Sequence, residues 1–143
     1  MKCKTVFGYN GGMPPKDLSE LLKYWQGISD HEYDFAKENH RSNAYPLQVL
    51  FHLHLSVEAL LKARIVYHQH DHAPYSHNLE YLAGYAGIKL SKQKVESLTI
   101  LNKFNITGRY PEDLEYINKL DKKFVNDLFN KIEDLIKWLK KQF

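Results

Sequence analysis

The segment PLQVLFHLHLSVEALLKARIVY (residues 46–67) is the most informative stretch of the sequence. Apolar side chains fall on nearly every side of a helix built from it, and a helix that is apolar all round is usually buried inside a fold. The preceding Ser42 and Asn43 are typical helix-start residues, and Pro46 is tolerated in a first turn. We therefore expect a central helix that starts at Ser42–Asn43 and continues to Val66 or Tyr67.

One side of this helix combines large apolar residues with a pair of opposite charges. At 100° per residue, an arc of about 100° holds the side chains of Phe51, His54, Glu58, Leu61, Lys62 and Ile65. Glu58 and Lys62 are four residues apart in the favourable order. A lone buried charge is costly, so the two side chains must satisfy each other if this side faces the core. The pair is either a structural salt bridge or a polar anchor for a ligand-facing group.

The opposite side of the same helix carries small or polar side chains. They are Gln48, His52, Ser56, Ala59 and Ala63. Small side chains let another backbone approach closely, as at the small-residue contacts between packed helices. We expect this arc to contact either a neighbouring helix or a second subunit.

The rest of the chain predicts further helices and almost no strand. A helix capped by Asp17, with Glu20 completing a capping box, extends to about Asn39. Ser76 caps a short helix from His77 to about Tyr85 that stops at Gly87. Helical spacing then recurs in two stripes, Val95, Leu98, Leu101 and Phe104 after a Ser91 cap, and Leu120, Phe124, Leu128, Ile132, Leu135 and Leu139. The expected fold is all-α, an up-and-down antiparallel bundle of four to five helices.

Composition and length place this bundle in one ordinary domain. The chain has 143 residues and a formal net charge of +3, which calls for no nucleic-acid partner by itself. Residues 1–15 contain the glycines and prolines of a mobile or loosely docked arm, and residues 16–143 form the bundle. Cys3 is the only cysteine, and no apolar segment is long enough to cross a bilayer. We expect a soluble, cytoplasmic protein.

Several short motifs together resemble the HEPN domain family. They are Phe51–Ala63, Ser76–Leu79 with Leu82, and Leu101–Asn102 leading to Arg109–Pro111, with a looser match at Trp25, Asp30, Asp34 and Ala36. The resemblance covers about residues 17–141. It implies a bundle of four to five helices, usually a homodimer. Many HEPN domains act with a small nucleotidyltransferase in toxin–antitoxin or related pairs, while others are metal-independent ribonucleases or proposed nucleotide-binding modules.

The ribonuclease branch of this family carries an Arg followed, after four to six residues, by a His. Arg109 stands at the corresponding place, but no histidine follows it anywhere in the sequence. Arg64 and His70 have the right spacing, but they stand at the end of the second helix, so we regard the match as accidental. We therefore favour a non-catalytic module with a nucleotidyltransferase partner. The alternative is a ribonuclease that uses Arg109 with a histidine from the second helix.

Arg109 and Tyr110 are the first candidates for a binding site. Arg109 ends a segment, residues 89–109, with five basic residues and one acidic residue, and Tyr110 follows it. An Arg offers a two-pronged contact to phosphate and a Tyr offers a stacking face, so a nucleotide or RNA phosphate is the expected ligand. The alternative is structural: Arg109 binds a helix end or a carboxylate such as Glu58.

Histidine is the other residue type to consider. His77, at a helix start, is expected to hydrogen-bond across the bundle, joining Glu58 and Lys62 as a candidate site residue. His68, His70 and His72 alternate in a helix end and loop, which does not aim them at one point. We expect no metal site, no other cofactor and no catalytic residue.

Overall fold

The computed structural model describes residues 17–105 and 120–143. The helices are α1 (Leu18–Arg41), α2 (Pro46–Gln69), α3 (Leu79–Tyr85), α4 (Lys92–Asn102) and α6 (Lys122–Lys140). Within these ranges the fold is an all-α bundle without strands, as predicted. The predicted arm, residues 1–15, lies outside the described residues, as do Arg109 and Tyr110.

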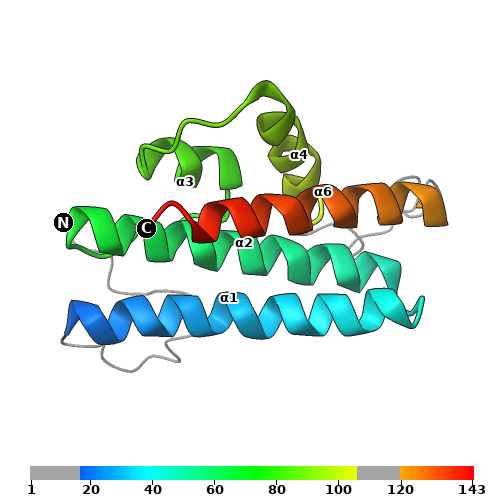
Figure 1. The fold of residues 1–143 in the computed structure, drawn as a ribbon, viewed down its shortest axis with the longest axis horizontal. Coiled ribbons are helices and arrows are strands. Elements are labelled where there is room, and N and C mark those ends of the chain that lie inside the picture. The colour runs from blue at the N-terminus through cyan, green and yellow to red at the C-terminus, as the bar shows by residue number, and fades with distance from the viewer. Residues whose placement is uncertain (1–16, 106–119) are drawn as a thin grey trace.

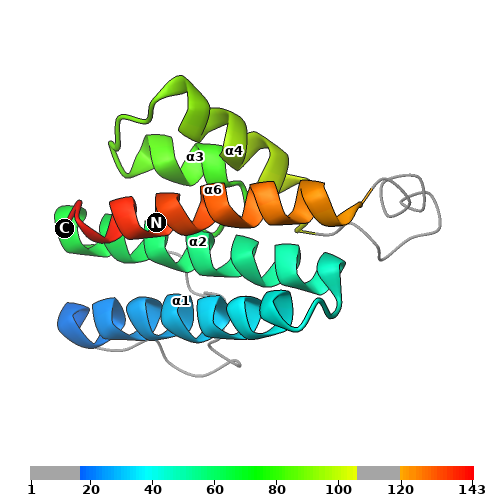
Figure 2. The same cartoon turned by 45° about the vertical axis from the view of Figure 1, so that its right-hand side comes forward.

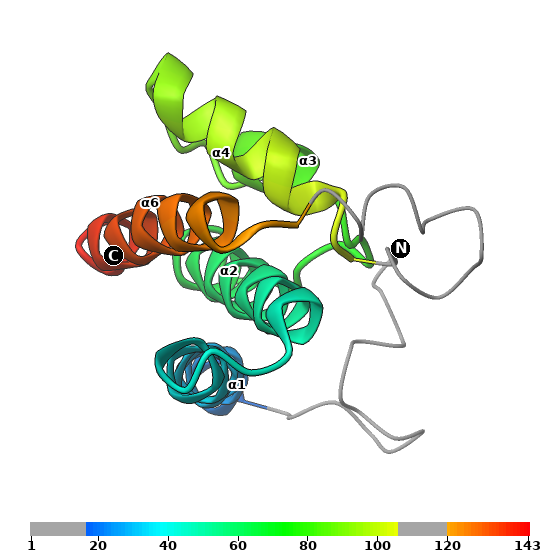
Figure 3. The same cartoon turned by 90° about the vertical axis from the view of Figure 1, so that its right-hand side faces the viewer.

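The central position of α2 is confirmed. Figures 1 and 2 show α1 and α2 as an antiparallel pair, with α6 running along the other side of α2. Figure 3 shows α3 and α4 as a further layer over α2 and α6. The larger core lies between these helices and includes Leu50, Leu61, Leu98, Leu128 and Ile132, which are at most 3% exposed. Because neighbours surround α2, both its apolar residues and its charged pair are buried.

The small-residue side of α2 contacts α1. Ser56 donates a hydrogen bond to the backbone oxygen of Ser29 (2.8 Å), and the two hydroxyl oxygens lie 3.1 Å apart. Ala59 and Ala63 pack with Leu21 and Trp25 in a second apolar cluster. Of the two expected partners for this arc, the structure therefore shows the neighbouring helix.

Three polar contacts join α1 to α6. The Tyr33 hydroxyl donates to the Glu133 carboxylate, and the His40 Nε2 lies 2.7 Å from the Asn126 Oδ1. Lys140 forms an exposed ion pair with Asp30 at 2.8 Å. These side-chain contacts link α1 to α6, whose backbone packs mainly against α2 and α4.

The structure corrects two predicted helix starts. Ser42 and Asn43 belong to the end of α1, where Ser42 is the C-cap, and α2 begins at Pro46. Asn78, rather than Ser76, caps α3, because its side chain accepts from the Tyr81 N–H at 3.1 Å. The Ser76 hydroxyl instead accepts from the Asn78 N–H at 3.1 Å.

Two predicted stripes also differ from the structure at their first member. Val95 is 38% exposed, whereas Leu98 and Leu101 are buried, so the inner side of α4 starts later than predicted. Leu120 precedes α6, which Asp121 caps by accepting from the Phe124 N–H at 2.7 Å. None of the described helices has the length and hydropathy needed to span a membrane.

Candidate functional site

A buried carboxylate on α2 holds a half-exposed histidine from the segment before α3. The Glu58 side chain is 1% exposed, and its Oε1 lies 2.7 Å from the His77 Nδ1. A carboxylate accepts hydrogen bonds, so the contact requires a proton on Nδ1 and leaves Nε2 as the nitrogen open to a ligand. The His77 side chain is 38% exposed. The pair therefore connects the core to the surface.

Lys62 completes the charge pair predicted from the sequence. Its side chain is fully buried one helical turn after Glu58, and its Nζ lies 3.9 Å from the Glu58 Oε2. The same ammonium lies 5.1 Å from the ring centre of the buried Trp25, which adds a cation–π contact. Glu58 thus has one oxygen on His77 and the other toward Lys62, so the inward orientation expected for the pair is confirmed.

His54 lies one turn before Glu58 on the same side of α2 and is fully buried. Burial lowers the pKa of His54, contacts with the Asn102 side chain and the His77 backbone raise it, and the neighbouring His77 and Lys62 lower it. Together these effects bring the pKa from 6.5 to about 4. The ring is therefore neutral at physiological pH. We call Glu58, Lys62, His54 and His77 the polar cluster.

Asn102, at the end of α4, positions the segment that carries His77. Its Oδ1 accepts from the Leu79 N–H at 2.8 Å, and its Nδ2 donates to the Asn78 Oδ1 at 3.1 Å. One side chain thus satisfies the first turn of α3 and the residue that caps it. Because His77 immediately precedes this turn, Asn102 fixes the backbone from which the imidazole reaches Glu58.

The comparisons with known proteins identify the family of the chain. The HEPN domain family matches residues 22–142, which is most of the chain. The chain belongs to the HEPN domain family. The residues quoted above for this resemblance include three from the contacts described here: Glu58, His77 and Asn102.

A solved structure has the same fold as this HEPN domain. The crystal structure of TT1696 from Thermus thermophilus aligns with a TM-score of 0.69 at 15% identity, covering 85% of this chain and 98% of that one. At this identity the likeness concerns the fold. Comparison with the curated proteins gives no significant match.

Of the five candidate site residues predicted from the sequence, the structure brings three together. Glu58, Lys62 and His77 form one contact set, and the predicted reach of His77 across the bundle is confirmed. Arg109 and Tyr110 lie outside the described residues. The predicted binding role of all five remains a prediction.

The other histidines lie apart from the polar cluster. His70 is the C-cap of α2, and its backbone has a φ of 54° in the left-handed region. His52 forms an ion pair with Glu32 and packs on the Phe35 ring at 4.1 Å between ring centres. Within residues 17–105 and 120–143, no group of three or more His, Cys, Asp or Glu residues is placed to hold a metal ion.

Sequence reasoning did not identify His54 and Asn102 as site residues. His54, Glu58 and Lys62 are spaced by four residues each, and that repeat of ionisable residues in an apolar helix is a usable signal. Asn102 gives no such signal, because its role depends on how α4 packs against α3.

Proposed function

We propose that this protein is a non-catalytic, cytoplasmic HEPN module that forms a homodimer and acts with a small nucleotidyltransferase, as in toxin–antitoxin-like pairs. In this proposal it binds the phosphate of a nucleotide or an RNA, with His77, Arg109 and Tyr110 as contact residues. The partner class and the dimer come from the family resemblance. The contact residues come from the chemistry of this chain.

The observation that carries the proposed binding site is the buried Glu58 that holds the half-exposed His77. A buried carboxylate is costly, and here it is offset by Lys62 on one side and by an imidazole that reaches the surface on the other. A His77 ring that gives its Nδ1–H to Glu58 and carries a second proton on Nε2 donates that second proton to a phosphate oxygen. Because Glu58 already fixes the ring orientation, this contact costs little conformational entropy. Glu58 and Lys62 act behind His77 and position it.

The positions of His52 and His54 on α2 support a binding role rather than catalysis. A general acid or base must come within hydrogen-bond reach of the reacting group. His54 is fully buried, and His52 is occupied by Glu32. No histidine follows Arg109 in the sequence.

The binding proposal is tested by fluorescence anisotropy with a labelled ATP analogue and a labelled single-stranded RNA. We expect at least one probe to bind, and His77→Ala and Arg109→Ala each to weaken binding about tenfold, since each removes a charged hydrogen bond. His68→Ala, an exposed histidine of the last α2 turn, is the matched control and should bind as the parent does. Failure of both probes to bind, or equal losses in the control, would contradict the proposal.

Catalysis is tested separately by incubating the purified protein with RNA in the presence of a chelator. We expect intact RNA. Cleavage that persists through purification and disappears in both Arg109→Ala and His70→Ala would replace the non-catalytic proposal with the ribonuclease alternative.

The proposed partner is tested by purifying the tagged protein from its own host and identifying bound proteins by mass spectrometry. A small nucleotidyltransferase, recovered in a stoichiometric amount, is the expected result. Recovery of the protein without any nucleotidyltransferase would contradict the partner assignment and leave the binding measurements unaffected.

A further inference from the structure

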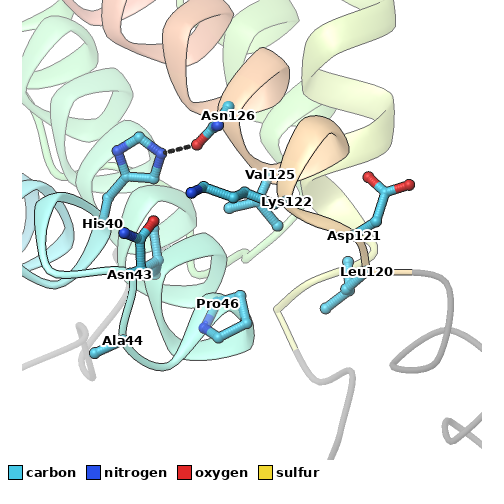
Figure 4. A pocket seen from close by; sticks show the side chains of 10 residues that line it. His40, Asn43, Ala44, Pro46, Leu120, Asp121, Lys122, Val125 and Asn126 are labelled. Carbon is cyan, nitrogen blue, oxygen red and sulfur yellow. Dashed lines mark hydrogen bonds between the residues drawn. The ribbon is translucent and has the colours of Figure 1, made fainter.

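A cavity of about 280 Å³ lies at the end of the bundle where α1 turns into α2 and α6 begins. This is close to the smallest volumes typical of ligand pockets. Figure 4 shows its lining, with Ala44 from the turn, Pro46 from the start of α2, Leu120 from just before α6 and Val125 from its first turn. Val49 lies behind this lining and is fully buried. The cavity is therefore mainly apolar and is separate from the polar cluster.

The polar side chains around this cavity come from three segments. His40 stacks on Phe129 with 4.0 Å between ring centres, and its Nε2 lies 2.7 Å from the Asn126 Oδ1. The ring therefore has a fixed orientation, and Asn126 keeps its Nδ2 as a donor. In Figure 4 the Lys122 ammonium lies on the side of His40 and Asn43. Hydrogen-bond donors and one full positive charge thus meet at one mouth.

The helix ends around the cavity add to its positive potential. The 24-residue α2 begins at Pro46, and its N-cap Tyr45 makes no side-chain capping hydrogen bond. The 19-residue α6 begins at Lys122. Both N-termini carry partial positive charge.

Two negative groups, a carboxylate and a helix C-terminus, also lie at this end of the bundle. The Asp121 carboxylate accepts from the Phe124 N–H, and Figure 4 shows it pointing away from His40 and Asn43. The C-terminus of α1 carries partial negative charge, but its Glu38 and Asn39 carbonyls accept from the Ser42 and Ala44 N–H groups. Among the described lining residues, Lys122 therefore supplies the full positive charge that faces the mouth.

We propose that this cavity binds a small carboxylic acid with an apolar body. The apolar body rests on Pro46, Val125 and Leu120, and the carboxylate meets the Lys122 ammonium and the side-chain amides at the mouth. The volume is about that of nine water molecules in the liquid, which suits a ligand the size of benzoate. This site is independent of the proposed nucleotide or RNA contact.

The test is a titration of the ¹⁵N-labelled full-length protein with benzoate, followed by two-dimensional NMR. We expect shifts concentrated in residues 40–49 and 120–126. Lys122→Gln should weaken benzoate binding about tenfold, because a charged hydrogen bond is lost. Asn43→Gly should also weaken binding without straining the turn, since Asn43 has a φ of 55° that glycine adopts freely.

Lys123→Gln is the matched control, because Lys123 is an exposed lysine of the same helical turn that does not line the cavity. It should bind benzoate as the parent does. Equal losses in Lys122→Gln and Lys123→Gln would reduce the effect to overall charge and overturn the site. Benzyl alcohol binding as tightly as benzoate would overturn the carboxylate requirement. Inorganic phosphate binding at least as tightly would overturn the requirement for an apolar body, and no benzoate shifts at all would overturn the proposal outright.

Discussion

His54 is a buried side chain whose pKa the fold lowers well below its ordinary value. Its pKa is 6.5 when exposed and about 4 when folded, so the unfolded chain binds the extra proton first as pH falls. The free energy of unfolding should therefore decrease from about pH 6.5 to about pH 4, by a total of about 3 kcal/mol from this residue. His54→Gln, which is neutral at every pH, should remove this part of the loss. Urea unfolding at pH 7 and pH 5 measures it, and equal losses in both proteins would refute it.

Glu58 and Lys62 should depend on each other for burial. Glu58→Ala leaves the Lys62 ammonium in the core without its carboxylate and should lower the free energy of unfolding by about 3–5 kcal/mol. The double variant Glu58→Leu with Lys62→Met replaces both charges by apolar groups and should regain most of that loss. Urea unfolding of Glu58→Leu, of Lys62→Met and of the double variant gives the coupling. Additive losses would show that the two charges do not interact.

At the scale of the helix, alanine substitutions at Gly27 and Gly87 should change the free energy of unfolding in opposite directions. Gly27 lies within α1, and a Cβ added there meets no atom within 4 Å. Gly27→Ala should therefore raise the free energy of unfolding by about 1 kcal/mol through helix propensity. Gly87 follows the C-cap of α3 and has a φ of 70°. Gly87→Ala should therefore lower the free energy of unfolding by about 1 kcal/mol. Thermal unfolding of both variants checks the pair, and a shift in the same direction for both would contradict it.

The sequence predicted helix identity better than helix ends. Asp17 and Ser91 cap as expected, because each stands alone before an apolar stripe. The start of α2 was misplaced, because Ser42 and Asn43 favour either end of a helix and here close α1. In the candidate site, the spacing of Glu58 and Lys62 lies within one helix and was readable. The same four-residue spacing includes His54, whereas the role of Asn102 requires the packing of α4 against α3, which spacing along one helix does not contain.

At the scale of the whole molecule, the homodimer is a prediction with a restricted geometry. The small-residue arc of α2 cannot supply the interface while α1 covers it, since Ser56 and Ala59 are at most 1% exposed. We expect light scattering at high micromolar concentration to give twice the mass of one chain. Ser29→Ala, which changes only the α1–α2 contact, should leave that mass unchanged. A single-chain mass for the parent would contradict the dimer.

The enclosure of α2 has a further consequence for how the molecule opens. Each of the other described helices packs against it: α1, α3, α4 and α6. When any one of these four helices detaches, the other three still shield much of the α2 backbone from solvent. Deuterium from solvent should therefore reach the amides in the middle of α2 last, at a rate that reports complete rather than regional unfolding.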